Sequence, residues 1–281
     1  MKLSVAIQTP EVVPMVPVAL ISGSFEEKLE KAARWGAQGV ELMTTEPLKL
    51  DWNEVSARLT SNGLEACAIA SGANVSALGL TIVNADAAKA SLAKRRLAEL
   101  IDLAEAVGAP IVTIGGFRGR ISTVGENGKA YLVDVLREAC IYAQQRSVRL
   151  ALEPLNRYEN ELINNAAQGL EFIQEVNHPA LGLLLDTFHM NIEETSWTEP
   201  FRNLMKAGKL WHIHLGDNNR LAPGKGMIDF RAIVRTLREI GYSGYLSAEL
   251  LAKPDPDTAA RETLAYMRSL LASEPSRGRK D

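Results

Sequence analysis

Four short apolar runs in the second half of the sequence end in a group that can bind a metal ion. They are Leu150-Ala-Leu-Glu153, Leu183-Leu-Leu-Asp186, Trp211-His-Ile-His214 and Leu246-Ser-Ala-Glu249. An ionised carboxylate at the end of a buried run is costly unless it is paired or bound to a cation. Three carboxylates and one imidazole form a hard, oxygen-rich donor set that suits Mn²⁺, Mg²⁺ or Co²⁺. We therefore expect Glu153, Asp186, His214 and Glu249 to bind one divalent ion, with Mn²⁺ favoured.

A second histidine lies beside this set. His212 and His214 are two positions apart on one predicted strand, so both side chains face the same side of the sheet. His214 is closer to the end of the strand, so we assign it as the ligand and His212 as a partner behind it. Glu41, at the end of an earlier apolar run, either faces the substrate or caps a loop. Any one of these acids alone would most often be a cap, but four successive runs of this kind favour the metal site.

A metal ion flanked by two glutamates indicates proton-transfer chemistry on a sugar. The ion acts as a Lewis acid on a carbonyl and the neighbouring hydroxyl, which eases removal of the adjacent carbon-bound proton and gives a cis-enediolate. Glutamates on opposite faces can serve as acid and base. Return of the proton to the other face is epimerisation, and its delivery to the former carbonyl carbon is aldose–ketose isomerisation. The residues indicate the enediolate class and leave both outcomes open.

The elements that would carry these groups alternate along the chain. Apolar runs predict eight buried strands, at 2–8, 39–43, 65–71, 110–116, 149–155, 181–187, 210–217 and 245–251. Segments of helical period between them predict eight helices, at 25–35, 52–62, 86–107, 129–146, 166–176, 199–207, 229–240 and 257–272. Asp86 and Asp229 are expected to begin their helices, and Gly108 and Gly241 to follow the ends.

Eight strand–helix units in series are typical of a (β/α)₈ TIM barrel, an α/β fold. In such a barrel the catalytic groups lie at the carboxyl ends of the strands, where the four candidate ligands are placed. The alternative is a doubly wound open sheet, which would need a glycine-rich turn after the first strand. This chain has Gln8-Thr-Pro10 there, so the barrel is the predicted fold.

Composition excludes several other classes of protein. The chain has 281 residues, 46% of them hydrophobic, and no linker-like stretch, so we expect one barrel domain over 1–272 and a polar, disordered tail over 273–281. A net charge of -3 gives no basic field, so neither nucleic acid nor membrane is an expected partner. Two cysteines give no disulfide framework, and neither a signal peptide nor a membrane span is evident, so a cytoplasmic protein is expected.

Three motifs resemble those of the metal-dependent ketose 3-epimerases of the xylose isomerase-like superfamily. They are Glu153-Pro-Leu-Asn-Arg-Tyr-Glu159, Asp186-Thr-Phe-His-Met-Asn-Ile-Glu-Glu194 and His214-Leu-Gly-Asp-Asn-Asn-Arg220. The resemblance implies that Glu153 and Glu249 are the proton-transfer pair. It also implies that Glu159, His189 and Arg220 hold substrate oxygens. A small ketose or keto sugar acid would be the substrate, and a homo-oligomer, dimer or tetramer, is implied.

Further segments are more similar to family members that epimerise 5-keto-L-gluconate, a sugar acid. They are Asp51-Trp-Asn-Glu-Val55, Cys67-Ala-Ile-Ala-Ser-Gly72 and Gly116-Phe-Arg-Gly-Arg120. Arg118 and Arg120 follow the fourth strand directly and could bind a carboxylate bidentately. A keto sugar acid of the 5-keto-L-gluconate or tagaturonate type is therefore expected, with a ketohexose as the alternative. Where the neutral-sugar enzymes usually have Glu and Cys after the last histidine, this chain has Asp217 and Asn218.

Three other functions compete with the epimerase. An aldose–ketose isomerase, acting on hydroxypyruvate or a pentose, would use the same metal site. A DNA-repair endonuclease on the same barrel would need a multi-zinc cluster rich in histidine, whereas this chain has four histidines and an acidic balance. A non-catalytic sugar-binding barrel would have no need of paired glutamates. The sequence therefore favours an enediolate-forming enzyme.

Overall fold

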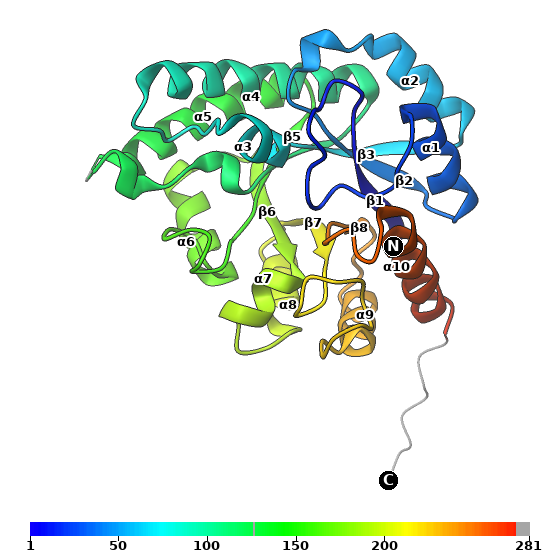
Figure 1. The fold of residues 1–281 in the computed structure, drawn as a ribbon. Helices are drawn as coiled ribbons and strands as arrows, with labels where there is room; N and C mark the ends of the chain where they lie inside the picture. The colour runs from blue at the N-terminus through cyan, green and yellow to red at the C-terminus, as the bar shows by residue number, and fades with distance from the viewer. Residues whose placement is uncertain (126, 274–281) are drawn as a thin grey trace.

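The computed structural model describes residues 1–125 and 127–273, and these form the predicted TIM barrel (Figure 1). Eight parallel strands pair in chain order, and the last pairs with the first to close the barrel. The strands are β1 (Lys2–Gln8), β2 (Gly39–Met43), β3 (Glu65–Ala70), β4 (Ile111–Ile114), β5 (Arg149–Leu152), β6 (Leu181–Asp186), β7 (Leu210–Leu215) and β8 (Tyr245–Ala248). The expected tail falls on 273–281, of which 274–281 lie outside the described residues.

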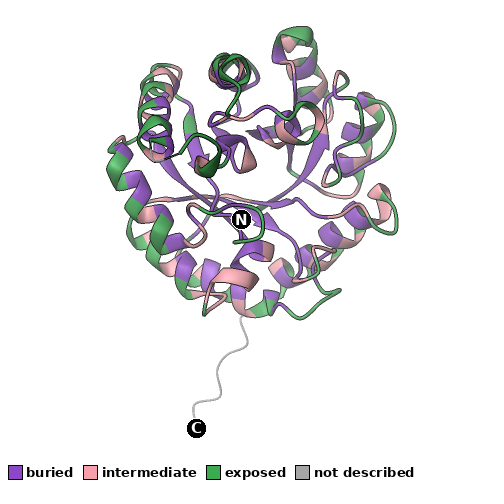
Figure 2. Cartoon of the chain, turned by 60° about the vertical axis from the view of Figure 1, so that its left-hand side comes forward, coloured by how far each residue is buried: buried purple, intermediate pink, exposed green. Residues whose placement is uncertain are grey.

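A ring of helices surrounds the barrel, with buried faces toward the strands and exposed faces outward (Figure 2). The helices are α1 (Phe25–Arg34), α2 (Trp52–Ser61), α3 (Gly72–Leu78), α4 (Ala87–Val107), α5 (Gly128–Gln145), α6 (Ala166–Val176), α7 (Thr187–Glu193), α8 (Glu199–Lys206), α9 (Phe230–Glu239) and α10 (Pro256–Ala272). Three short 3₁₀ turns, η1 (Pro47–Lys49), η2 (Gly116–Arg118) and η3 (Ile121–Thr123), lie in the loops. No helix in the described part of the chain is both long and apolar enough to cross a bilayer.

The helix boundaries follow from side-chain caps. Asp86 accepts hydrogen bonds from the N–H groups of Ala88 and Lys89 at the start of α4, and Gly108 ends that helix with φ 72°. Asp229 likewise caps α9, and Gly241 follows it with φ 72°. A short polar side chain satisfies the free N–H groups of the first turn, and glycine adopts the left-handed conformation at low cost. These predicted ends are confirmed.

The strands are shorter at their carboxyl ends than the sequence predicts. β4, β5, β7 and β8 end two or three residues early, because the chain turns there into the loops that carry the polar groups. Two helices, α3 and α7, were not predicted. Each has seven residues and lies directly at the end of a strand, where the apolar run hides the change of period. Most of the barrel core is one continuous apolar cluster, and both cysteines are buried and free.

Candidate metal centre

The four predicted ligands converge at the carboxyl end of the barrel. Glu153 follows β5, Asp186 ends β6, His214 lies near the end of β7 and Glu249 follows β8, so four neighbouring strands each contribute one group. One ligand atom from each lies within 4.8 Å of the others. All four side chains are buried. Parallel pairing aligns Asp186 with His214, because the register of β6 and β7 sets these two residues side by side.

The donor atoms at this point suit a divalent cation. Glu153 Oε1, Asp186 Oδ2 and His214 Nδ1 are buried and have no hydrogen-bond partner in the described structure. Buried polar atoms normally find partners, so three orphans aimed at one point indicate a missing ligand. Three carboxylates and one nitrogen match the preference of Mn²⁺, Mg²⁺ or Co²⁺ for oxygen-rich sites. The residues present therefore fit one divalent ion.

Burial disturbs the protonation of the ligands when no ion is bound. Burial and the charge of Glu153 raise the pKa of Asp186 to about 7. Burial also raises the pKa of Glu153. Burial opposes the charge of His214, but Glu41 and Glu249 raise the pKa of that imidazole well above its ordinary value. The site therefore holds protons at neutral pH that a bound cation would displace.

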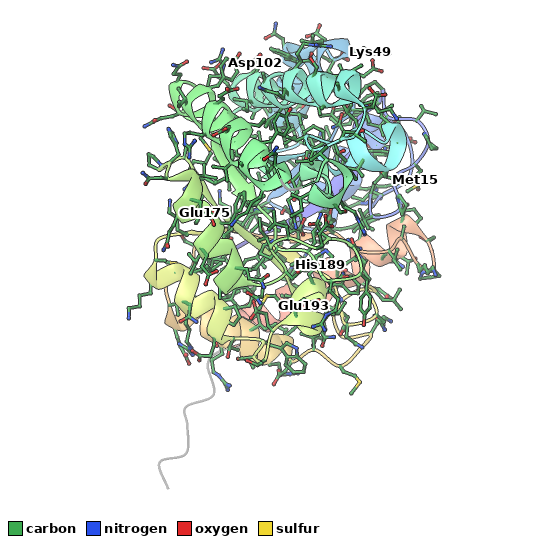
Figure 3. All side chains as sticks on the ribbon, turned by 90° about the vertical axis from the view of Figure 1, so that its left-hand side faces the viewer. Met15, Lys49, Asp102, Glu175, His189 and Glu193 are labelled. Carbon is green, nitrogen blue, oxygen red and sulfur yellow. The ribbon has the colours of Figure 1, made fainter. Side chains whose placement is uncertain are left out.

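Asp186 serves two elements at once. Its Oδ1 accepts a hydrogen bond of 2.8 Å from the N–H of Phe188 and so caps α7. Its Oδ2 faces the metal centre. The helix cap and the metal ligand, which are alternatives for an acid at a strand end, are combined here in one carboxylate. The following helix α7 then brings His189 over the site, and Figure 3 labels His189 and Glu193 of this helix.

Glu41 lies inside the barrel, behind the ligands. Its Oε2 is 3.0 Å from Nε2 of His212 and 3.0 Å from Nε2 of His214. The expectation that Glu41 faces the substrate or caps a loop is therefore wrong, because its carboxylate is fully buried between two imidazoles. The register of β2 against β3 shifts between Val40 and Glu41. His212, as expected, is a partner behind the ligand, and it reaches His214 through the shared carboxylate.

The residues implied as substrate ligands form a second group at the mouth. Glu159 Oε1 lies 3.2 Å from Nη1 of Arg220 and accepts a hydrogen bond of 3.0 Å from Nδ2 of Asn156. Asn156 Nδ2 also lies 2.8 Å from Nδ1 of His189. Asn156 was not predicted as a site residue, although it lies in the segment from Glu153 to Glu159. The structure thus brings Glu159, His189 and Arg220 together through one asparagine.

The prediction that Arg118 grips a substrate carboxylate is wrong. Its side chain is fully buried, and its two terminal nitrogens donate to the carbonyls of Gly115, Glu153, Leu162 and Ile163. Arg120 Nη2 donates to the carbonyls of Tyr158 and Glu159 instead of facing the pocket. Both arginines therefore join the loop after β4 to the loop after β5. The sequence indicated that both arginines lie at the mouth of the barrel. It did not show that carbonyl groups of another loop would be their hydrogen-bond partners.

Asp217 and Asn218 also bind the main chain. Asp217 is fully buried and accepts hydrogen bonds from the N–H groups of Gly224, Gly226 and Ile228. Asn218 Oδ1 accepts one from the N–H of Met227. These contacts shape the loop that carries Arg220. The two residues that depart from the neutral-sugar pattern therefore bind main-chain groups and fix the conformation of the loop.

A cavity of about 300 Å³ is lined by three of the four ligands, Glu153, His214 and Glu249. One side carries the ligands and the second polar group, and Arg220 is the one arginine or lysine among the described lining residues. The other side is largely apolar, and it includes Val16, Pro17, Val18, Met43, Val75 and Leu251. Gly115 lies against Glu153, where a Cβ atom would come within 2.3 Å of Oε2. The cavity has the size and polarity of a small-molecule site.

Residues 29–270 match the family described as the xylose isomerase-like TIM barrel. The chain belongs to this family. Within it, D-psicose 3-epimerase of Enterocloster bolteae is 42% identical over 120 residues, which are 42% of this chain and 39% of that relative. L-ribulose 3-epimerase of Methylomonas sp. is 28% identical over 247 residues, which are 85% of this chain and 82% of the relative.

Solved structures of the family agree with the fold. The structure of an L-ribulose 3-epimerase is 27% identical and has a TM-score of 0.77, with 95% of this chain and 94% of that chain covered. These relatives are all carbohydrate epimerases, a class of isomerases, and the similarity extends along most of the barrel. None of these three relatives is named for 5-keto-L-gluconate.

Proposed function

We propose that this protein is a metal-dependent ketose 3-epimerase that inverts the carbon next to the ketone of a ketohexose. The observation that carries the proposal is the convergence of Glu153, Asp186, His214 and Glu249 on one point beneath a cavity of about 300 Å³. The similarity to a D-psicose and an L-ribulose 3-epimerase supports the same reaction class.

The four converging residues would hold one divalent ion, for which Mn²⁺ is the favoured candidate and Mg²⁺ and Co²⁺ are alternatives. When bound, such an ion supplies Lewis acidity to the ketone oxygen and the adjacent hydroxyl of the sugar. Glu41 and His212 hold His214 from behind. All four ligands are buried, so few of their atoms meet bulk water.

Glu153 and Glu249 are the proposed proton-transfer pair. They extend from β5 and β8, on either side of the β6 and β7 ligands. One carboxylate removes the C3 proton from one face of the sugar, and the other returns a proton to the opposite face, so C3 is inverted. Epimerisation is reversible, so each glutamate acts as base in one direction and as acid in the other.

Glu159, His189 and Arg220 are proposed to hold substrate oxygens. His189 and Arg220 are largely buried beside the ligands, and all three line the cavity. Burial lowers the pKa of His189 well below its ordinary value, and the nearby charges of Arg220 and Arg118 lower it further, so the ring is neutral. A neutral ring can donate a hydrogen bond to a sugar oxygen without adding a second cation beside the metal.

The substrate expected from the sequence, a keto sugar acid, remains the alternative. Its support was a carboxylate grip by Arg118 and Arg120, and both bind main-chain carbonyls instead. Arg220 is the one lining guanidinium in the described cavity, and it is already paired with Glu159. The apolar wall opposite the ligands offers no charge to an acid. A neutral ketohexose is therefore the proposed substrate.

The test is a product analysis in D₂O. Metal-stripped protein is restored with Mn²⁺ and given D-psicose, L-ribulose or 5-keto-L-gluconate, and the products are read by NMR. We expect D-psicose to form its C3 epimer, with deuterium at C3 and the carbonyl unmoved. An aldose product with deuterium at C2, the former carbonyl carbon, would indicate an isomerase. Absence of exchange at C3 of any ketose, with or without metal, would overturn the proposal.

An endonuclease finds little support in the geometry. In residues 1–125 and 127–273 the two groups that could hold a metal are Glu41–Cys67–His212 and Glu153–Asp186–His214–Glu249. Each contains a single histidine, whereas a multi-zinc cluster needs several. Burial raises the pKa of Cys67 far above its ordinary value, so its thiol is protonated and is a poor ligand.

A further inference from the structure

His189 presents one ring nitrogen to the site and the other to a loop. Its Nε2 is buried, has no hydrogen-bond partner among the described residues, and lies 3.9 Å from Asp186 Oδ2 and 4.0 Å from Glu153 Oε1. Its Nδ1 lies 2.8 Å from Nδ2 of Asn156 and 3.3 Å from the main-chain N–H of the same residue. The chemistry that Nε2 can perform depends on which of the two nitrogens carries the proton.

The orientation of the Asn156 amide can be assigned without reference to the histidine. Its Oδ1 accepts a hydrogen bond of 3.0 Å from the N–H of Tyr158. Its Nδ2 donates one of 3.0 Å to the carboxylate of Glu159. A flipped amide would place two oxygens together at Glu159 and two donors together at Tyr158. The atom of Asn156 that faces His189 is therefore the NH₂ group, a donor.

Nδ1 of His189 consequently faces two donors. One is the amide Nδ2 of Asn156, and the other is its main-chain N–H. A nitrogen that carries a proton cannot accept either bond, so Nδ1 must be the unprotonated nitrogen. A neutral imidazole has one N–H, which places the proton on Nε2, the atom that faces the site.

We propose that Asn156 is a positioning residue that holds His189 in the neutral Nε2–H tautomer, so that this ring donates a hydrogen bond to a substrate oxygen. The identity of that oxygen, a ketone or hydroxyl oxygen of a ketose, rests on the proposed function. The tautomer itself rests only on the contacts of Asn156. The opposite tautomer would turn a lone pair toward the substrate oxygen, and that lone pair would also compete for the metal.

The side-chain contacts explain why asparagine is needed. Its amide supplies an acceptor for Tyr158 and two donors, one for Glu159 and one for His189, so all of its polar groups are used. Aspartate has the same shape but no donor. An aspartate at this position would accept a hydrogen bond from a protonated Nδ1 of His189 and so favour the opposite tautomer, against the main-chain N–H of the same residue. The substitution N156D therefore changes the polarity of the contact with little change in volume.

The experiment reads the tautomer directly. The full chain is loaded with diamagnetic Mg²⁺, its four histidines are labelled with ¹⁵N, and ring nitrogens are correlated with ring protons by NMR. Signals of His189 are identified by their loss in H189Q. The wild-type protein is expected to show a protonated Nε2 and an unprotonated Nδ1 at His189. In N156D the share of rings with a protonated Nδ1 is expected to rise, because only the main-chain N–H of residue 156 still donates to that nitrogen.

A matched control exists on the same loop. Asn160 is also buried, donates to the carbonyl of Gly119 and accepts from the N–H of Leu162, but does not contact His189. N160D makes the same chemical change and is expected to leave the His189 tautomer as in the wild type. N156A, which removes the side-chain amide and keeps the main-chain N–H, is expected to raise the protonated share of Nδ1 less than N156D does, and it serves if N156D does not fold. A protonated Nδ1 in the wild-type ring would overturn the proposal, as would an unchanged pattern in both N156D and N156A.

Kinetics separate this proposal from the proposed function. In N156D, kcat for the ketose is expected to fall about 100-fold, as for the loss of one preorganised donor, with a smaller change in KM. N160D is expected to keep kcat. If no ketose is turned over by the wild type, the proposed function fails while the NMR result still decides the tautomer. If N156D raises the protonated share of Nδ1 but leaves kcat unchanged, Asn156 has no role in positioning for catalysis.

Discussion

Two histidines in this site are held by partners in two different layers, the barrel strands and the loops at the mouth. One ring presents an unprotonated nitrogen to the site, and the other presents an N–H group. His214 lies on a barrel strand, and a buried carboxylate, Glu41, binds its Nε2, which leaves Nδ1 free at the metal centre. His189 lies on a short helix at the mouth, and an amide, Asn156, binds its Nδ1, which leaves Nε2 free. With an acceptor behind the first ring, the nitrogen that faces the site is free to act as the proposed metal ligand. A donor behind the second makes it a hydrogen-bond donor.

The two layers also differ in how they are held. The inner layer comprises the four candidate ligands and Glu41. These residues lie on strands or directly after them, so their positions follow from the pairing of β1 with β2 and of β5 through β8. The outer layer is a set of loops tied by Arg118 and Arg120 to main-chain carbonyls. Within one active site, strand pairing therefore holds the candidate ligands, and hydrogen bonds between loops hold the groups that would meet the substrate.

The comparison predicts that removal of either histidine abolishes a different property. H214A is expected to lose its bound metal and all measurable turnover, because a ligand is gone. H189A is expected to keep its metal and to lose about 100-fold in kcat, because only a donor is gone. Metal analysis of both purified variants, together with their kinetics, tests the distinction. Equal loss of metal in both would show that the two rings are not separated in role.

The second-largest effect is expected at Glu41, the carboxylate behind His214. E41Q replaces the carboxylate that holds both imidazoles, and it is expected to weaken Mn²⁺ binding about 10- to 100-fold, the range known for groups behind a metal ligand. Titration of the metal-free protein with Mn²⁺ measures the change. T113V, which removes one hydroxyl contact to the same carboxylate, is the milder control. An unaltered affinity in E41Q would contradict the role given to the inner layer.

A metal ion and protons compete for the carboxylates of the inner layer. The stabilisation of the fold by a bound metal ion should therefore depend on pH. The pKa of Asp186, raised to about 7 by burial and Glu153, means that the metal-free fold loses stability as pH rises from the unfolded value of 3.8 toward 7. A bound ion needs the deprotonated form, so it binds better as pH rises. The increase in Tm produced by Mn²⁺ is therefore expected to be larger at pH 8 than at pH 6. The same increase at both values would contradict this.

The smallest effect is expected at the outer edge of the loop layer. R120A removes two hydrogen bonds to the carbonyls of Tyr158 and Glu159 on an exposed side chain. KM is expected to change slightly, and equally, for a neutral ketose and for 5-keto-L-gluconate. Steady-state kinetics with both sugars give the comparison. A rise in KM for the acid alone would restore the sugar-acid assignment.

The sequence was most informative about the residues whose positions are set by strand pairing. Glu153, Asp186, His214 and Glu249 each follow an apolar run, and parallel strands bring the ends of such runs to one edge, so their convergence was predicted. Helix α7 was missed because it starts directly at the end of β6. The sign in the sequence was Asp186 itself, because aspartate often caps helices, and its side chain does accept the N–H of Phe188.

The outer layer could not be predicted because its contacts join segments far apart in the chain. Arg118 binds the carbonyl of Leu162, 44 positions away, and no local pattern shows that this partner exists. Asn156 gains its role from His189, 33 positions away. Glu41 reaches His214 across 173 positions of chain. Sequence placed these polar groups near the mouth or the barrel, and only the fold decided which carbonyl, amide or ring each would meet.

The close approach at Gly115 limits how this pocket could be redesigned. Any side chain at that position would begin with a Cβ atom 2.3 Å from the carboxylate oxygen of Glu153, so even alanine would displace a proposed proton carrier. Gly116, whose Cβ would lie at an ordinary 3.9 Å from Val75, has room. In a mutant library aimed at new sugars, variation at the second glycine would leave Glu153 in place, whereas any side chain at the first would move its carboxylate.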